Sequence, residues 1–331
     1  MQTDYGMRQA ICYPELTGYV HSGETVILNT TAVEMKLGTG GMDFIVHIER
    51  EPSYPEPPGH IFKLRYTPLQ TPVLAVEAPE SPWHKEIAAF SSLGGTPVVC
   101  AELHSQLAAI AFAIHHTARK PVRVVYIMTD GAALPLALSR MVSTMLEKNL
   151  IQATITCGQA FGGDLEAVNL YSALAAAKVA VKADIIIVCQ GPGGVGTSTS
   201  LGFSGIEQGS ALNAVSSLGG YPIAAVRLSG SDPRKRHRGI SHHTLTVLQT
   251  VTLCSAHVAL PEQKEKIEGD DLIDTKHEIH CLPADDALEA LLNSGITVNT
   301  MGRTIMEDSG FFLAACAAGQ LAASTVSPDS D

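Results

Sequence analysis

The residues best suited to chemistry lie in a glycine-rich stretch, 191–198, which follows directly on an apolar run ending at Cys189. Glycine lets backbone N–H groups approach a phosphate or carboxylate closely, and the start of a following helix favours the same anion. The last two side chains of the stretch add hydroxyl donors. We predict that an anionic group is bound by Gly191, Gly193, Gly194, Gly196, Thr197 and Ser198. The alternative is a turn that serves only chain geometry.

A classical NAD site is disfavoured, although Gly191, Gly193 and Gly196 match the Gly-x-Gly-x-x-Gly spacing of dinucleotide-binding loops. The third glycine of that pattern belongs to the first helical turn, whereas here Ser204 and Glu207 predict a capping box that delays the helix. No acidic residue ends the next expected strand, Pro222 to Leu228. A phosphate-bearing cofactor or a divalent metal remains compatible with the sequence.

A basic segment supplies a second anion-seeking feature. Five basic residues face one acid, so the local charge is five minus one, or +4, in a chain of net charge -11: Arg227, Arg234, Lys235, Arg236 and Arg238 against Asp232. Arginine binds carboxylate and phosphate bidentately, and Ser241 is placed to cap a helix. We predict anion binding by Arg236, His237 and Arg238. The alternative is a solvated basic loop that pairs with the acidic stretch 262–274.

Carboxylates and histidines near expected strand ends are candidates for acid–base chemistry, ribose binding or metal binding. The candidates are Asp130, Asp164, Glu166, His104 and His242 or its neighbour His243. Adjacent helical residues point about 100° apart, so one of the two neighbouring histidines is expected to face a given site. Asp130 could instead form a turn, and Asp164 could cap a helix. The ligand-rich segment 277–281 is expected to be structural, because alternation along a strand separates its side chains.

Composition narrows the class of partner. The 331 residues are 45% apolar and 17% charged, with a pI of about 5.6. These values exclude a disordered chain and argue against nucleic acid as a partner. We expect a cytoplasmic protein that does not bind membranes, because no apolar run is long enough to span one and no signal peptide is recognisable. The expected partner is a small anionic molecule, and a homo-oligomer is compatible with the composition.

The elements that must position these residues indicate an α/β fold. Short runs that are apolar on both faces alternate with segments of helical period, which predicts a mostly parallel, doubly wound, Rossmann-like sheet with helices on both faces. The expected strands are 97–100, 122–128, 153–157, 184–189, 222–228, 250–254 and 279–282. The expected helices are 105–118, 134–149, 164–181, 204–218, 241–248, one from about 285, and 302–323.

A small β domain is expected before this sheet. Strand-like runs at 26–28, 44–48 and 61–66 precede the change of pattern, and 51–59 holds four prolines in a stiff connection. The predicted organisation is a β domain over 1–72, an α/β domain over 73–325 and a disordered tail over 326–331. In an open α/β sheet, ligands bind outside the carboxyl ends of the strands. The glycine loop, the basic segment and the candidate acids all follow expected strands, so we expect them at one edge.

Specific polar motifs run along nearly the whole chain: Leu37-Gly38-Thr39-Gly40-Gly41, Met128-Thr129-Asp130-Gly131, Phe161-Gly162-Gly163-Asp164-Leu165-Glu166, Gly202-Phe203-Ser204-Gly205-Ile206-Glu207 and Arg236-His237-Arg238-Gly239-Ile240-Ser241-His242-His243. These motifs resemble those of a bacterial family, domain of unknown function 3866. The resemblance implies a bacterial source and brings no established activity. It also suggests that the start of the chain departs from its relatives.

Three functions are compatible with these observations. The first is an enzyme whose substrate or cofactor carries phosphate or carboxylate, bound by the glycine loop and the basic segment. The second is a non-catalytic sensor of a small anion, and the third is a structural or oligomeric subunit. The enzyme alone requires acid–base groups within reach of the bound anion.

Overall fold

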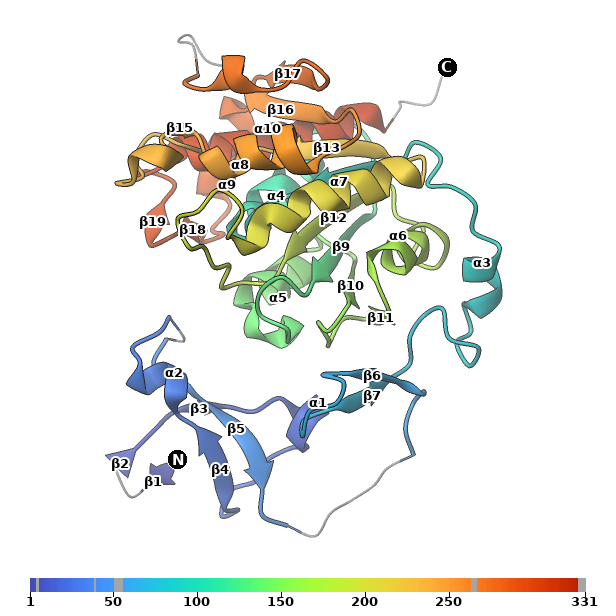
Figure 1. Ribbon diagram of the computed structural model, residues 1–331, viewed down its shortest axis with the longest axis vertical. Coiled ribbons are helices and arrows are strands. Elements are labelled where there is room, and N and C mark those ends of the chain that lie inside the picture. Colours follow the sequence, from blue (N-terminus) through green and yellow to red (C-terminus); the bar gives the residue numbers. More distant parts are fainter. Residues whose placement is uncertain (4–5, 39, 51–55, 263–266, 327–331) are drawn as a thin grey trace. The chain divides into compact units, whose positions relative to one another are not determined.

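The computed structural model describes residues 1–3, 6–38, 40–50, 56–262 and 267–326, and it divides into two compact units, Met1–Leu74 and Ala75–Asp331 (Figure 1). Parts of three expected features lie outside the described residues: the proline-rich connection at 51–55, the acidic stretch at 263–266 and the tail at 327–331.

The first unit is a small β structure, as its short alternating runs predict. Its three-stranded sheet has the order β3-β5-β4. The strand bounds are β1 Gln2–Thr3, β2 Gly6–Met7, β3 Ala10–Ile11, β4 Val26–Asn29, β5 Asp43–Ile48, β6 Ile61–Lys63 and β7 Thr71–Val73. Two single-turn helices accompany them, α1 Pro14–Thr17 and α2 Thr31–Glu34. Asp43 is buried and accepts two hydrogen bonds from the Arg8 guanidinium, which offsets the burial of its charge.

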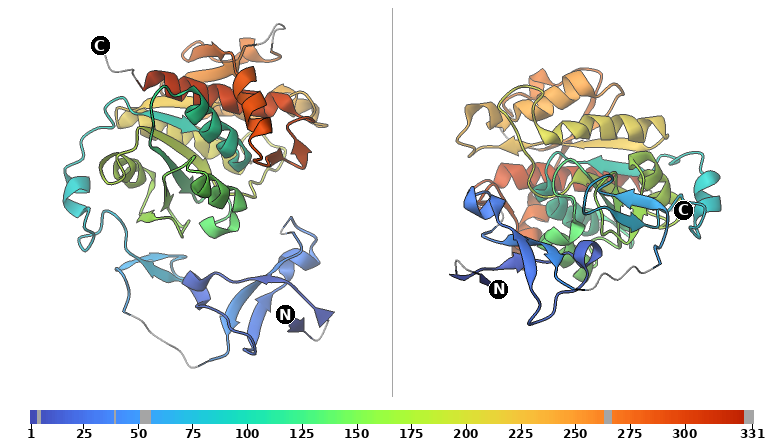
Figure 2. Two further views of the ribbon diagram at one scale, coloured as in Figure 1. Left: turned by 180° about the vertical axis from the view of Figure 1, so that it is seen from behind. Right: turned by 60° about the horizontal axis from the view of Figure 1, so that its bottom comes forward.

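The second unit is an α/β fold around an eight-stranded sheet in which all neighbouring strands run parallel (Figures 1 and 2). The strand order is β11-β10-β9-β12-β8-β13-β16-β17. The bounds are β8 Pro97–Cys100, β9 Val124–Thr129, β10 Ala153–Cys157, β11 Leu165–Ala167, β12 Ile185–Gln190, β13 Tyr221–Ala225, β16 His257–Pro261 and β17 Glu278–Leu282. Every residue of β8, β9 and β12 is buried, which explains why these runs are apolar at consecutive positions.

Helices cover both faces of the sheet, because alternate strand residues point to opposite cores. One face packs against α4 Leu107–Thr117, α5 Arg140–Glu147, α9 Asp285–Asn293 and α10 Ser309–Thr325. The other packs against α3 His84–Ala88, α6 Leu170–Val179, α7 Glu207–Ser217 and α8 His242–Thr246, which continues as a π-helix, Val247–Val251. Val99 and Tyr126 contribute to the first core, whereas Val98 and Val125 contribute to the second. The doubly wound arrangement is the one that the sequence pattern predicts.

The connections reverse direction in the middle of the sheet. From β8 the chain passes to β9, β10 and β11 on one side. It then returns to β12, which lies between β9 and β8, and crosses to β13, β16 and β17 on the other side. The connections leaving the neighbouring strands β8 and β12 therefore run in opposite directions, over opposite faces of the sheet. Such a reversal leaves a crevice at the carboxyl ends of the strands, where α/β proteins commonly bind ligands.

One expected strand is wrong. The apolar run at 250–254 is not a strand but the end of the π-helix and the turn after it, and the strand follows as β16. Asn213 on α7 explains the turn, since its Oδ1 atom accepts from the backbone N–H groups of Leu253 at 2.7 Å and Cys254 at 3.3 Å. Its Nδ2 atom donates to the carbonyl of Val251 at 3.0 Å. A long-range side chain thus overrides the local β propensity.

Three expected helix starts are also wrong. The helix expected from 134 begins at Arg140, because Leu136–Leu138 forms a separate 3-10 turn and Ser139 caps the α-helix. The segment 164–181 is a short strand, β11, followed by α6, whose cap is Asn169 accepting from the N–H of Ser172 at 3.1 Å. The last helix begins at Ser309 rather than 302, because a small hairpin precedes it, β18 Asn299–Thr300 with β19 Arg303–Thr304. These errors shorten all three helices.

The capping box expected at Ser204 is absent, because both side chains bind elsewhere. Ser204 Oγ accepts from the N–H of Val195 at 3.0 Å, and the Glu207 carboxylate accepts from the Thr129 hydroxyl. The cap expected at Ser241 is confirmed, since its Oγ accepts from the N–H of His243 at 3.2 Å.

Candidate functional site

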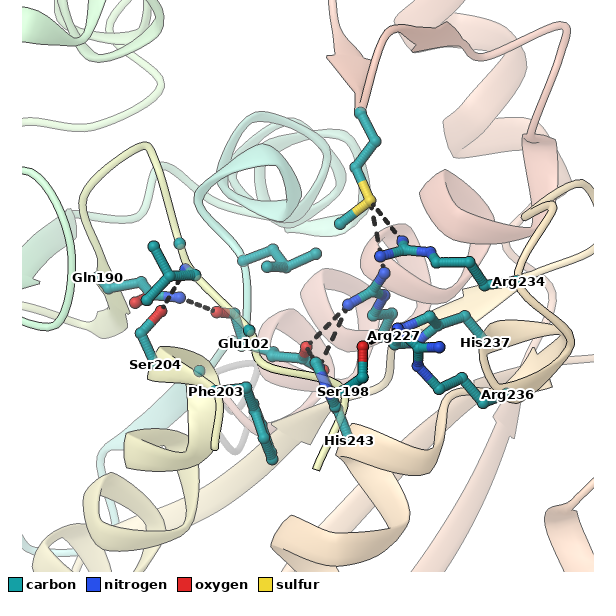
Figure 3. Close-up of a pocket in the computed structure, with 16 residues that line it drawn as sticks. Glu102, Gln190, Ser198, Phe203, Ser204, Arg227, Arg234, Arg236, His237 and His243 are labelled. Atoms are coloured by element: carbon teal, nitrogen blue, oxygen red, sulfur yellow. Dashed lines mark hydrogen bonds and ion pairs between the residues drawn. The ribbon is translucent and has the colours of Figure 1, made fainter. Parts of the chain in front are cut away.

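A pocket in the second unit lies at the reversal point of the sheet, outside the carboxyl ends of β8, β12 and β13 (Figure 3). Its walls come from three connections. Glu102 follows β8, the stretch Gly194–Ser198 follows β12, and Arg227 to His243 follows β13. Met301 of the β18–β19 hairpin closes one side. The pocket therefore brings together the glycine loop and the basic segment, which lie some 40 residues apart in the sequence.

Glu102 occupies the floor of this pocket and is almost fully buried, with 1% of its surface exposed. Its Oε1 atom accepts from Arg227 Nη1 at 3.1 Å and from His243 Nδ1 at 2.8 Å. Its Oε2 atom is buried and has no hydrogen-bond partner among the described residues. An unpartnered buried carboxylate oxygen is costly, so it favours a ligand that brings a hydroxyl or amine donor to this position.

The His243 ring is held in one orientation. It stacks on Phe203, with ring centroids 3.7 Å apart and planes 4° from parallel. The hydrogen bond to Glu102 uses Nδ1, so the neutral ring that donates there carries its lone pair on Nε2. A carboxylate that orients a histidine in this way prepares it to accept a proton.

The glycine loop is shaped by close packing and by its own hydrogen bonds. A Cβ atom on Gly191 would lie 2.5 Å from the Ala133 carbonyl oxygen, so this glycine serves packing rather than the pocket wall. Gly193 has a φ of +87° and also lies outside the lining. The Thr197 hydroxyl donates within the loop to the Gly202 carbonyl at 3.0 Å. Gly194, Gly196 and Ser198 line the pocket.

The arginines differ in how much of their charge is already paired. Arg234 binds Asp232 through two bonds of 2.9 Å, and Arg227 is paired with Glu102. Arg236 is exposed and donates to the Ser198 hydroxyl at 3.0 Å, and across the described ranges no carboxylate lies within ion-pairing distance of it. Arg236 is therefore the pocket cation best placed to bind an anion. Arg238 lies outside the lining and donates to the Asp232 carbonyl at 3.0 Å.

Three histidines meet beside the pocket. The ring centroids of His237, His242 and His243 lie 4.4 to 4.9 Å apart, and one potential ligand atom from each lies within 4.8 Å of the others. Burial and the nearby Arg227 and Arg234 charges lower the pKa of His237 to about 3. Burial, with the adjacent imidazole second, also lowers the pKa of His242. The rings could hold a metal as neutral ligands, but the surrounding guanidinium charges oppose a bound cation.

The other predicted acid–base residues do not line the pocket. Asp130 follows β9 and accepts from the N–H of Gln159 at 2.8 Å. Glu166 lies within β11 and accepts from the Thr156 hydroxyl at 2.7 Å. A hydrogen bond of 2.7 Å joins His104 Nε2 to Ser139 Oγ, and burial lowers the pKa of His104 to about 4. These contacts give all three side chains local structural partners.

Asp164 lies at the opposite edge of the sheet from Arg236. Its Oδ2 atom accepts from the N–H and the hydroxyl of Thr154, both at 2.8 Å, at the amino end of β10. Asp164 therefore neither lies at the edge of the sheet that carries the pocket nor caps a helix, so both interpretations of this residue are wrong. The physical reason is β11, which starts at Leu165 and runs parallel to β10, so the residue before it sits at the amino edge.

Two acidic residues near the site were not singled out from the sequence. Glu102 could have been found by the same strand-end reasoning, since it follows Cys100 by two positions. Glu207 could not, because local spacing suggests a helix cap. It instead contacts Thr129 near Asp130, and burial raises its pKa to about 7, with the Asp130 charge acting in the same direction. A carboxyl with a pKa near 7 is a candidate proton carrier, although Glu207 is not among the residues that line the pocket.

The fold and the pocket define an α/β protein with a polar, arginine-lined pocket at the carboxyl edge of its sheet. The family model described as "Protein of unknown function (DUF3866)" matches residues 9–319, so the chain belongs to that family. No curated protein and no solved structure matches the chain. Along the described ranges, none of the helices combines the length and apolar character needed to cross a bilayer.

Proposed function

We propose that this protein is an enzyme that binds a small molecule through a phosphate or carboxylate group and uses His243, oriented by Glu102, as a general base. The observation that carries the proposal is the buried Glu102–His243 hydrogen bond of 2.8 Å beside the unpaired charge of Arg236. A cation that holds an anion next to an oriented base is the arrangement that a proton-transfer enzyme needs.

The anion would lie between the glycine loop and the basic segment. Arg236 supplies a guanidinium that can turn from Ser198 to the ligand, and the hydroxyl of Ser198 can follow it. Gly194 and Gly196 also line the pocket and would offer backbone N–H donors to the anion. Charge-assisted bonds of this kind contribute about 1.5–3 kcal/mol each, which corresponds to roughly tenfold to a hundredfold in affinity.

The proton would be taken from a hydroxyl or water beside the base. His243 would accept it at Nε2, and Glu102 would stabilise the resulting imidazolium through Nδ1. The unpartnered Oε2 atom of Glu102 would accept a hydrogen bond from the hydroxyl or amine of the ligand. The favoured substrates therefore carry an anionic group and a neighbouring donor, as phosphorylated alcohols and hydroxy acids do.

Calorimetric titration with inorganic phosphate tests the anion site. Arg236→Ala should weaken phosphate binding by about tenfold or more. Arg238→Ala is the matched control, because it removes an exposed arginine two residues away that does not line the pocket. Equal loss in both variants would mean that phosphate responds only to the overall basic charge, and binding unchanged by Arg236→Ala would contradict the assignment.

A substrate screen tests the base. Turnover of phosphorylated alcohols or hydroxy acids by the wild type should be lost in His243→Gln, whereas phosphate affinity should stay within about twofold because the arginines remain. The variant retains an amide that can bond to Glu102, so far-UV circular dichroism should be unchanged. Phosphate binding without turnover by the wild type across the screen would favour the alternative, a sensor of small anions.

A further inference from the structure

We infer that the protein binds a divalent zinc ion at a second place, on the paired strands β16 and β17, through His257, Glu278 and His280. These residues lie at or near the amino ends of their strands, whereas the anion pocket lies at the carboxyl ends. The inference therefore stands independently of the proposed function. The contact that carries it joins His257 Nδ1 to His280 Nε2 at 3.0 Å.

The spacing of the two imidazoles and the carboxylate fits a zinc site. Glu278 Oε2 lies 3.4 Å from His257 Nδ1, and Glu278 Oε1 lies 3.4 Å from His280 Nε2. With zinc–ligand bonds of about 2.0–2.1 Å, the edge of a tetrahedron is about 3.3 Å. The 3.0 Å between the two ring nitrogens and each 3.4 Å separation lie close to that edge, and one ligand atom from each residue lies within 4.8 Å of the others. One ion can therefore contact both ring nitrogens and one carboxylate oxygen after small side-chain movements.

Strand register explains why these residues meet. Glu278 and His280 are two positions apart in β17, so they share one face of the strand. His257 pairs in register with Glu278 on the neighbouring strand β16. Alternation along β17 therefore brings Glu278 and His280 together instead of separating them. The neighbouring strand β16 supplies the third ligand, His257. His277 is excluded, since its ring nitrogens bond to the Leu248 carbonyl at 2.9 Å and the Ala256 N–H at 3.2 Å.

The site is oriented and its charge favours a cation. The His257 ring stacks on Tyr221 of β13, with centroids 3.7 Å apart and planes 9° from parallel. Glu278 brings a negative charge, whereas Lys276, two residues before it, donates to the Thr252 carbonyl at 2.8 Å. Two imidazoles and one carboxylate favour zinc over magnesium or calcium, which prefer oxygen ligands. A water molecule can take the fourth position, since Glu278 is 62% exposed.

Zinc titration of metal-stripped, full-length protein tests the inference. The wild type should bind one equivalent, measured by competition with a chromogenic chelator and by metal analysis after desalting. Glu278→Gln and His280→Gln should each weaken zinc binding by at least about tenfold. Magnesium at the same concentration should not compete. A wild type that binds no zinc, or variants that bind it as tightly as the wild type, would overturn the inference.

Two histidine variants serve as controls. His116→Gln removes an exposed histidine on α4, and His242→Gln removes a member of the histidine cluster at the pocket. Both should bind zinc as the wild type does, and loss of the single equivalent in His242→Gln would move the site to the pocket and refute the assignment. Glu278 is exposed, so Glu278→Gln should melt at the wild-type temperature in chelator. Zinc should slow amide exchange across β17 in the wild type and not in Glu278→Gln.

Discussion

Removing the Glu102 carboxylate should destabilise the second unit strongly. Glu102→Ala leaves Arg227 and His243 buried without the Oε1 atom that both now contact, at 3.1 and 2.8 Å. Breaking a buried ion pair by deleting one partner costs about 3–5 kcal/mol. Arg227 keeps a second carboxylate, Asp232, at 3.6 Å, which places the expected loss near the lower limit, about 3 kcal/mol.

Urea unfolding followed by tryptophan fluorescence measures this loss in the relevant unit, because the chain has one tryptophan, Trp83, and it lies in the second unit. The midpoint should fall in Glu102→Ala without a change in slope. Glu86→Ala, which removes an exposed carboxylate on α3, should shift the free energy of unfolding by less than about 0.5 kcal/mol.

A double-mutant cycle identifies the cause. Arg227→Met removes the buried guanidinium, so Glu102→Ala should cost less in that background than in the wild type, by about 1.5 kcal/mol or more. Two results would refute a stabilising role for this buried pair. One is a loss of less than about 1 kcal/mol in the free energy of unfolding for Glu102→Ala alone, and the other is a double variant whose loss equals the sum of the two single losses. Either result would mean that the buried contacts contribute little net free energy.

Two further predictions concern pH and packing. The pKa of Glu207 is raised from 4.5 to about 7, so the folded state holds this proton more tightly than the unfolded state, and stability is lost as pH rises from about 4.5 to about 7. The loss is at most about 3 kcal/mol. Between pH 5 and pH 8 the urea midpoint should fall more in the wild type than in Glu207→Gln, which has no carboxyl to titrate at this position. An equal change of midpoint in both proteins would contradict the prediction. Gly319→Ala on α10 should lower the free energy of unfolding by about 1–3 kcal/mol, because the new Cβ would lie 2.4 Å from the Ile110 carbonyl oxygen. Helix propensity alone would favour alanine, so an unchanged or raised free energy of unfolding would count against a steric cause.

Much of the fold could be predicted from local pattern. The strands at 97–100 and 153–157 match the observed bounds, because strands buried on both faces are mostly apolar, although Thr154 and Thr156 in the second strand are polar and buried. The sequence also predicted that Ser241 caps a helix, because the N–H group that it binds, that of His243, lies only two residues away. The failures at 164–181 and 250–254 have a common origin. In both segments the backbone conformation depends on a hydrogen bond to a residue outside the segment: Thr154 bonds to Asp164, and Asn213 bonds to Leu253. The residue pattern of the segment itself does not show these contacts.

The residues of the candidate site also fall into those that the local pattern predicted and those that depend on long-range contacts. Strand-end reasoning predicts the glycine loop and the basic segment as pocket walls, because both follow buried strands. It also assigns Asp164 to that edge, which is wrong, since the unpredicted strand β11 carries it to the other edge. Glu207 titrates near neutrality only because folding buries it.

By itself, the sequence determined which segments are buried as strands and which side chains follow them, because burial and chain order are recorded in hydrophobic pattern. Only the tertiary structure decided the strand order, and with it the reversal that joins Glu102 to His243 across 141 residues. Strand order depends on many weak contacts summed over the whole sheet, and no single segment encodes it. The same is true of His257 and His280, which become neighbours only when β16 and β17 pair in register.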